Sequence, residues 1–351
     1  MGDEKMKKTL LVLLIGIMAV SMVYAGGSQE SGAAGQQNKG SEEPLVWVWY
    51  PNESTPEYAE SRTAVINVAE EALGREIKEQ LTTDYAIAIE AVVNENAAFS
   101  WFGGEGYTQA HEREAAVLPL VTNTGKSGTL SDAKYYSMLG TLSENAGQYK
   151  VSGKYNLDTL KQKSFSFVSN SSTSGFRVPS SIISANFNVE AEELLEGGPN
   201  MVFSEVMFGG SHQGSFLNVL TEKADIGAFC NSCIDDYIDW VSGSYDDPAP
   251  GDVIKVKADA DAPFDRVPGV EVTLVATVPV LNAPIVMNTN LLTDEEVAKL
   301  KAAFTSDETA ANEKIFAPKD ADTIAFFDKG ERFAEVEDEW YDPIRKLSGL
   351  K

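Results

Sequence analysis

The chain has 351 residues, and its 53 acidic side chains against 28 basic ones give a formal net charge of −25 at pH 7. This excess of negative charge argues against nucleic acid as a partner and against adhesion to an anionic membrane surface. Hydrophobic residues make up 43% of the chain, a share typical of a packed globular protein and too high for a disordered one.

The N-terminus has the composition of a secretory signal. Three lysines within the first eight residues precede an apolar run over residues 9–22, and Val23 and Ala25 occupy the two positions that a signal peptidase reads. The run is shorter than the roughly 20 apolar residues that a membrane helix needs. We therefore expect residues 1–25 to be a signal peptide and the protein to be exported to the periplasm or cell surface. A retained membrane anchor is the alternative.

Residues 26–43 are rich in Gly, Ser and Gln and nearly free of apolar side chains. Such a segment cannot offset the entropy of ordering, so we expect a flexible linker. No cysteine follows the apolar run, which argues against a lipid attached there. Membrane tethering by other means stays open.

Strand-like and helix-like segments alternate from Leu45 onward. The first five are a strand at 45–51, a helix at 54–74, a strand at 76–82, a helix at 84–96 and a strand at 97–104. This order predicts a mostly parallel sheet with helices on its faces.

The pattern returns in the middle of the chain. A strand is expected at 165–170, a helix at 175–186, a strand at 200–210, a helix at 211–223 and a strand at 224–232. An acidic, Pro- and Gly-rich surface loop follows, and two helices are expected near Thr293 and Asp342. The fold class predicted is α/β, with two doubly wound lobes joined by a hinge of two crossings near residues 123–135 and 276–286.

The predicted lobes divide the chain discontinuously. Lobe 1 comprises residues 44–130 and 283–351, and lobe 2 comprises residues 131–282. Ligands of parallel α/β sheets bind beyond the carboxyl ends of the strands, so the cleft between the lobes is the expected site.

Three hydroxyl side chains, Ser172, Thr173 and Ser174, lie where a strand is expected to pass into a helix. Unpaired backbone N–H groups and the helix dipole favour an anion at such a helix start. Gly175 would let the backbone approach that anion closely. An ordinary helix cap is the alternative interpretation, although a cap needs only one hydroxyl.

The only two cysteines, Cys230 and Cys233, form a C-x-x-C pattern. An exported protein can oxidise such a pair, although the short loop would contribute little stability. A structural or incidental pair, a redox site and a metal site are the three interpretations. A zinc site would need two further ligands, and His212 alone does not supply them.

Six segments in order resemble the phosphate-, phosphite- and phosphonate-binding subunits of ABC importers, which have the type II periplasmic-binding-protein fold. The segments are "WYPNESTPEYAE", "TTDYAIAIEAVVNENAAFSWFGGEGY", "VSNSSTSGFRVP", "FGGSHQGSFLNVLTEKADIGAFCNS", "VPVLNAPIVMNTNL" and "YDPIRKL". The similarity extends from about Leu45 to Leu347.

The resemblance implies a set of ligand-binding residues with hydroxyl, imidazole and phenol side chains: Ser172, Thr173, Ser174, His212, Tyr85 and Tyr107. Tyr50 is added because it ends the first predicted strand. Each tyrosine could instead be core packing, and His212 could brace a turn. His111 is expected on a helix surface.

The sequence departs from the family where relatives that take aminoalkylphosphonates carry acids for the ligand ammonium. Those positions correspond here to Cys230 or Asn231, to Ala283 and to Gln213. An unpaired buried ammonium is costly, so we predict that 2-aminoethylphosphonate is not the best ligand. An alkylphosphonate, phosphite or phosphate is expected.

The predicted function is that of an extracytoplasmic solute-binding protein that hands a small oxyanion to an ABC permease. A monomer without a cofactor, a metal or catalytic residues is expected. The alternative is a sensor or ligand-binding module of the same fold that serves no transporter. A serine hydrolase is disfavoured because the sequence has no G-x-S-x-G motif, and no H-E-x-x-H motif is present either.

Overall fold

A computed structural model describes residues 43–318 and 324–349 of the protein. The predicted signal peptide and all but the last residue of the predicted linker lie outside these described residues. Within the described ranges, no helix is both long enough and apolar enough to cross a membrane.

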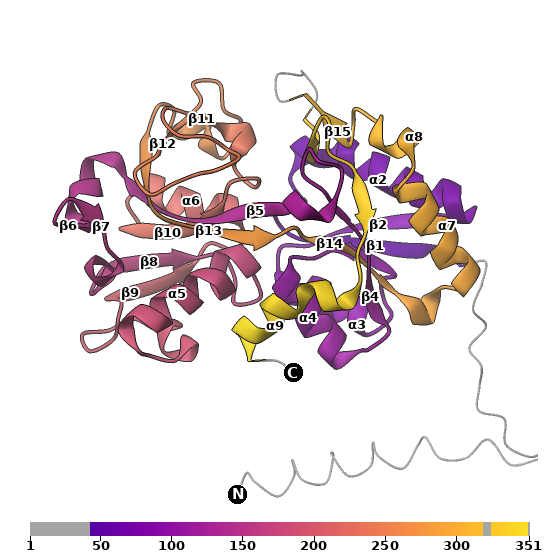
Figure 1. Cartoon of the computed structure of the whole chain (residues 1–351), viewed down its shortest axis with the longest axis horizontal. Helices are drawn as coiled ribbons and strands as arrows, with labels where there is room; N and C mark the ends of the chain where they lie inside the picture. The colour runs from indigo at the N-terminus through magenta and orange to yellow at the C-terminus, as the bar shows by residue number, and fades with distance from the viewer. Residues whose placement is uncertain (1–42, 319–323, 350–351) are drawn as a thin grey trace, which may run out of the picture. The chain divides into compact units, whose positions relative to one another are not determined.

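The first of two large sheets has six strands in the order β17-β4-β14-β3-β1-β2 (Figure 1). Their bounds are β1 Leu45–Trp49, β2 Ile77–Leu81, β3 Phe99–Trp101, β4 Val117–Asn123, β14 Pro284–Asn288 and β17 Phe333–Glu335. Strand β1 runs parallel to β2 and β3, as the alternating segments predict. Strands β14 and β17 return from later in the chain and pair antiparallel, so the sheet is mixed.

Helices cover both faces of the first sheet because its central strands β1, β3 and β14 have buried side chains on both sides. Helices α2 (Ala59–Leu73) and α7 (Asp294–Phe304) pack on one face, and the short α8 (Asp307–Ala310) follows α7. Helices α3 (Tyr85–Val93), α4 (Gly104–Arg113) and α9 (Asp342–Ser348) pack on the other face.

The second sheet has seven strands in the order β11-β12-β13-β5-β10-β8-β9. Their bounds are β5 Lys134–Leu142, β8 Ser164–Phe167, β9 Glu205–Phe208, β10 Ile226–Cys230, β11 Ile238–Trp240, β12 Val253–Val256 and β13 Glu271–Leu281. Only β8, β9 and β10 pair in parallel, and the remaining pairs are antiparallel. The expectation of a mostly parallel sheet is therefore wrong for both sheets. Three of the five strand pairs of the first sheet are antiparallel, and in the second the long strands β5 and β13 run beside each other in opposite directions.

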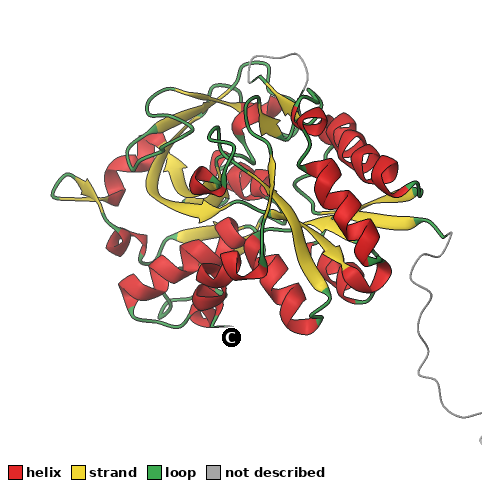
Figure 2. Cartoon of the chain, turned by 45° about the vertical axis from the view of Figure 1, so that its right-hand side comes forward, coloured by secondary structure: helices red, strands yellow, loops and turns green. Residues whose placement is uncertain are grey.

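Two helices cover opposite faces of the second sheet. Helix α5 (Val178–Phe187) packs on one face and α6 (His212–Leu220) on the other. A π-helical turn at Thr173–Arg177 leads directly into α5. Figure 2 shows helices packed outside the strands. Two small ribbons complete the strands: β6 Lys150–Val151 with β7 Lys154–Tyr155, and β15 Phe316–Ala317 with β16 Phe327–Asp328.

The chain passes between the two sheets twice. Strand β4 of the first sheet is followed by β5 of the second, and β13 of the second is followed by β14 of the first. The lobe limits at residues 130/131 and 282/283 fall in these two connections. The limits themselves stay a prediction, because the strand pairing defines sheets and not moving bodies.

Candidate ligand-binding site

A cavity of about 370 Å³ lies at the carboxyl ends of strands from both sheets. Tyr50 follows β1, Gly103 follows β3, Ser172 follows β8 and Asn231 follows β10, and all four line the cavity. At the carboxyl edge of an α/β sheet, each strand ends in a loop that leads into the next helix. The cavity therefore lies where the sequence pattern predicts a ligand.

Several helices begin at this cavity. Helix α3 begins at Tyr85, the turn leading into α5 begins at Thr173, and α6 begins at His212. Gly103 is the N-cap of α4. All four residues line the cavity. The unpaired N–H groups and partial positive charge of helix starts favour an anion, and here several such starts meet.

The hydroxyl cluster is almost fully buried, with Ser172, Thr173 and Ser174 exposed by only 2%, 2% and 1%. The Ser172 Oγ accepts a hydrogen bond from the Gly175 backbone N–H at 3.1 Å, as a helix cap does. The Thr173 Oγ1 has a different partner, the backbone N–H of Glu105 at the start of α4, at 2.8 Å. An acceptor already used in this way leaves the hydroxyl hydrogen free to donate to a ligand oxygen.

Two glycines keep the backbone close to this cluster. A Cβ on Gly103 would lie 2.6 Å from the Thr173 Oγ1, and a Cβ on Gly175 would lie 2.3 Å from the Val168 side chain. Both approaches are far shorter than van der Waals contact. Gly103 therefore lets the start of α4 pack against the hydroxyl cluster, and Gly175 lets the turn after Ser174 pack against Val168.

His212 is buried, with 3% of its surface exposed, and its Nε2 lies 3.4 Å from the Ser172 Oγ. Burial lowers the pKa of the imidazole to about 3. The ring is therefore neutral at physiological pH, and its Nδ1 has no hydrogen-bond partner in the described part of the chain. At this end of the cavity, the described lining residues supply neutral hydrogen-bond donors for an anion and no buried positive charge.

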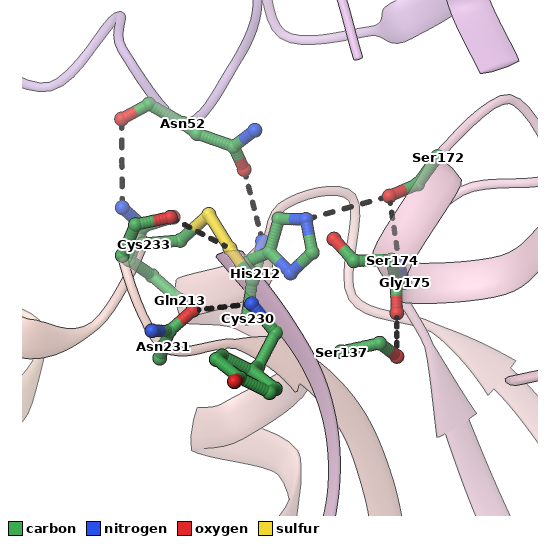
Figure 3. Close-up of a disulfide and its surroundings, with 12 residues drawn as sticks. Asn52, Ser137, Ser172, Ser174, Gly175, His212, Gln213, Cys230, Asn231 and Cys233 are labelled. Atoms are coloured by element: carbon green, nitrogen blue, oxygen red, sulfur yellow. Dashed lines mark hydrogen bonds between the residues drawn. A yellow bond between two sulfur atoms is a disulfide. The ribbon is translucent and has the colours of Figure 1, made fainter. Parts of the chain in front are cut away.

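Asn52 joins the first sheet's loop to the start of α6. Its Oδ1 accepts from the His212 backbone N–H at 3.0 Å (Figure 3), and its Nδ2 donates to the Tyr85 hydroxyl at 2.6 Å. Its carbonyl accepts from the Gln213 amide at 3.4 Å. Asn52 is not among the residues predicted from the sequence, although the "WYPNES" segment that contains it carries part of the resemblance.

The predicted tyrosines fall in two groups. Tyr50 and Tyr85 line the cavity with ring centroids 4.1 Å apart, and the buried Tyr50 hydroxyl has no hydrogen-bond partner within residues 43–318 and 324–349. Tyr107 does not line the cavity. Its ring packs against Tyr341, its hydroxyl donates to Asp338, and it lies one turn further along α4 on the face toward α9.

Tyr135 is a lining residue that the sequence analysis missed. Burial raises the pKa of its phenol to about 12, so the phenol stays protonated, and the neighbouring hydroxyls of Ser174 and Thr173 oppose this rise in part. The residue lies in the predicted hinge region, and its side-chain direction depends on how β5 sits in the sheet. No local pattern indicates it.

The cavity also contains carboxyl groups, at positions other than the family positions that lack acids here. Glu53 lines the cavity, and its Oε2 is buried with no hydrogen-bond partner among the described residues. Burial raises the pKa of this carboxyl to about 8. Asp235 and Asp236 lie in the wall as well, and the Tyr58 hydroxyl donates to Asp236 at 2.6 Å.

The two cysteines form a disulfide, which agrees with the structural interpretation of the pair. Cys233 lines the cavity, whereas Cys230 is buried at the end of β10. The second histidine, His111, hydrogen-bonds the Val117 carbonyl at 2.8 Å and does not line the cavity.

Comparison with known families resolves the identity of this fold. Residues 47–341 match the model of a family described as "ABC transporter, phosphonate, periplasmic substrate-binding protein". The chain belongs to this family. The match confirms the resemblance read from the six segments and the predicted function of a phosphonate-class substrate-binding protein of an ABC transporter.

Solved structures agree in fold. A binding protein component of an ABC phosphonate transporter from Pseudomonas aeruginosa is 18% identical, with a TM-score of 0.63 over 87% of this chain and 85% of that chain. PhnD1 from Prochlorococcus marinus, in complex with methylphosphonate, is 17% identical, with a TM-score of 0.62 over 88% and 98%.

A third similar structure, XAC2383 from Xanthomonas citri bound to ATP, is 16% identical, with a TM-score of 0.55 over 87% and 95% of the two chains. None of the curated proteins matches this sequence. Together the solved structures confirm the predicted two-lobed α/β fold of type II periplasmic binding proteins. The family is one of extracytoplasmic transport proteins and not of enzymes.

Proposed function

We propose that the cavity of this substrate-binding protein captures a phosphonate-type oxyanion at the hydroxyl cluster. The observation that carries the proposal is the meeting of Ser172, Thr173 and Ser174 with the neutral His212 and several helix starts in one buried wall. Hydrogen bonds from neutral donors to a charged ligand contribute about 1.5–3 kcal/mol each. A few such bonds are enough for capture that stays reversible.

The ligand-binding residues that we propose are hydroxyl, imidazole and phenol groups of the cavity wall: Ser172, Thr173, Ser174, His212, Tyr50, Tyr85 and Tyr135. Tyr107 is omitted because its hydroxyl is committed to Asp338 on the far side of α4. The His212 ring can accept the Ser172 hydroxyl hydrogen at Nε2 and donate an Nδ1–H to the anion.

Ligand capture is coupled to closure in this proposal. The bonds from Asn52 to His212 and from Tyr58 to Asp236 join the loops of one sheet to those of the other. Such contacts form only when the two halves approach, so a ligand that bridges them favours the closed form. The closed form would then dock on an ABC permease as a monomer.

Isothermal titration calorimetry of the purified protein against methylphosphonate, phosphite, phosphate and sulfate tests the proposal. We expect a 1:1 complex with at least one of the first three anions. The triple variant Ser172→Ala, Thr173→Ala, Ser174→Ala should lose that binding while its unfolding temperature stays near that of the wild type. Unchanged affinity in the folded triple variant would move the anion elsewhere.

Export follows from family membership, whereas the attachment of the protein after export is a further proposal. We propose that residues 1–25 are removed and that the remaining chain is not lipid-anchored, since no cysteine follows the apolar run. N-terminal sequencing of the protein from its native host decides between cleavage and a retained anchor.

A further inference from the structure

His212, Cys230 and Cys233 form a group of three metal-ligating side chains in the described part of the chain. One ligand atom from each lies within 4.8 Å of the other two. The cysteines come from the end of β10 and the histidine from the start of α6, so only the tertiary structure brings them together. Figure 3 shows the imidazole beside the disulfide, with Ser172 on its other side.

The imidazole has a nitrogen available for a further partner. Its Nδ1 is buried and unpartnered, while its Nε2 lies 3.4 Å from the Ser172 Oγ. In the tautomer in which Nε2–H donates to Ser172, Nδ1 carries the lone pair. A metal-bound histidine is usually held in this manner, with its second nitrogen hydrogen-bonded to an outer group.

The sulfur atoms belong to a C-x-x-C pair that forms a disulfide in the structure. C-x-x-C pairs with a histidine are common in tetrahedral zinc sites, where Zn–S is about 2.3 Å and Zn–N about 2.0–2.1 Å. Ligand atoms around one zinc ion are about 3.5–4 Å apart, so the two sulfurs must separate on reduction, whereas the histidine nitrogen already lies within 4.8 Å of them. As long as the disulfide is intact, its sulfurs carry no negative charge and bind zinc poorly.

We infer that the reduced protein binds one Zn²⁺ ion through His212, Cys230 and Cys233 in the wall of the cavity. A dithiol reductant supplies two electrons to the Cys230–Cys233 disulfide and is itself oxidised to a disulfide. This exchange leaves two thiols on the protein. Zinc binding then releases the two thiol protons. Because Cys233 lines the cavity, the fourth coordination position is open to water.

The sequence argued against this site because a zinc ion needs two ligands besides the cysteines, and His212 alone does not supply both. The start of α6 supplies one of the two from 18 residues before the first cysteine. The Ser232 hydroxyl, 3.7 Å from the Cys230 sulfur, adds an outer hydrogen-bond donor. The inference does not depend on the anion bound by the oxidised protein.

Cobalt is the probe for the test because tetrahedral thiolate-bound Co²⁺ has intense visible and near-ultraviolet bands. The full chain is reduced anaerobically with a phosphine, which takes up oxygen from water as it is oxidised, and Co²⁺ is then titrated in. We expect one Co²⁺ per chain with thiolate charge-transfer bands, displacement by Zn²⁺, and no bands in the oxidised protein. Absence of these bands in the reduced protein would overturn the inference.

Variants test the ligand set. Cys233→Ser and His212→Ala should each weaken Co²⁺ binding at least ~10-fold and change the visible bands. The matched control is His111→Ala, which removes the other histidine of the chain and should leave the spectrum unchanged. Equal affinity in His212→Ala would show that the sulfurs bind metal without the imidazole and would contradict the site.

A folding control keeps the result interpretable. If reduction lowers the unfolding temperature, added Zn²⁺ should restore it in the wild type and not in Cys233→Ser. Lack of this rescue in a destabilised wild type also contradicts the inference. Anion titration of the oxidised protein is a separate measurement, so its failure would affect the proposed function and not the metal site.

Discussion

The Thr173 Oγ1 lies 2.8 Å from the backbone nitrogen of Glu105 and accepts its hydrogen bond across 68 residues of sequence. A side chain at the start of one helix thereby caps the first turn of another, and the cap joins the two halves of the cavity wall. Because the oxygen is used as an acceptor, the hydroxyl hydrogen is directed away from Glu105 and toward the cavity.

Replacing Thr173 with valine keeps the volume of the side chain and removes this hydroxyl. We expect methylphosphonate affinity to fall about 10- to 100-fold, the loss of one hydrogen bond to a charged ligand. Calorimetry measures the change, and Ser181→Ala is the control because that hydroxyl bonds the Val178 carbonyl on α5, away from the cavity. An affinity within twofold of the wild type would remove Thr173 from the site.

Tyr85→Phe and Tyr107→Phe form a matched pair with opposite expectations. Tyr85 lines the cavity beside Asn52, so loss of its hydroxyl should weaken anion binding about 10-fold. The Tyr107 hydroxyl bonds Asp338 outside the cavity, so its loss should lower the unfolding temperature by a few degrees and leave affinity unchanged. The reverse outcome would restore Tyr107 to the ligand-binding set.

Asn52→Ala removes side-chain bonds to His212 and Tyr85. We expect weaker methylphosphonate binding by about 10-fold and a larger radius of gyration in the presence of subsaturating ligand, because the open form gains population. Small-angle scattering and calorimetry measure the two effects. Asn67→Ala, an exposed change on α2, is the control. Full closure and full affinity in Asn52→Ala would show that this contact is dispensable.

Ligand preference is tested by comparing 2-aminoethylphosphonate with methylphosphonate. The family positions that would meet an ammonium lack acids here, so we expect methylphosphonate to bind more tightly. Glu53 is one of the carboxyl groups in the cavity wall, and it is the one expected to reverse this order if an acid does so. Tight aminoethylphosphonate binding that is lost in Glu53→Gln would contradict the prediction and identify Glu53 as the substitute acid.

The pH dependence of stability gives a test of Glu53 without any ligand. Burial raises the pKa of this carboxyl from 4.5 to about 8, so the folded state retains a proton that the unfolded state loses. Its stabilising effect is complete below about pH 4.5 and is lost as the pH rises toward 8. Glu53→Gln should therefore gain stability relative to the wild type between pH 5 and pH 8, by on the order of 3–4 kcal/mol or roughly 7–14 °C.

Thermal unfolding of the ligand-free proteins at several pH values measures this difference. A gap between variant and wild type that stays constant from pH 5 to pH 8 would show that Glu53 ionises normally. Glu57→Gln, in the same segment, serves as the comparison.

The sequence by itself determined the order of the elements and the position of the hydroxyl cluster. Both depend on short-range chemistry: apolar periodicity, helix caps, and the N–H groups left unpaired at a helix start. The Ser172–Ser174 segment therefore lies where the sequence predicts, between β8 and the helix that follows. His212 and Tyr85 were added by the family motifs, and in the structure each of them begins a helix.

The tertiary structure decided which side chains share the cavity. Asn52 meets His212 from 160 residues away, and Tyr107 turns to α9 because one further turn of α4 faces the opposite side. The pairing of β5 with β13 and the position of α6 beside the disulfide are likewise set by long-range packing. Such contacts depend on how distant elements are stacked and rotated, which local propensity does not encode.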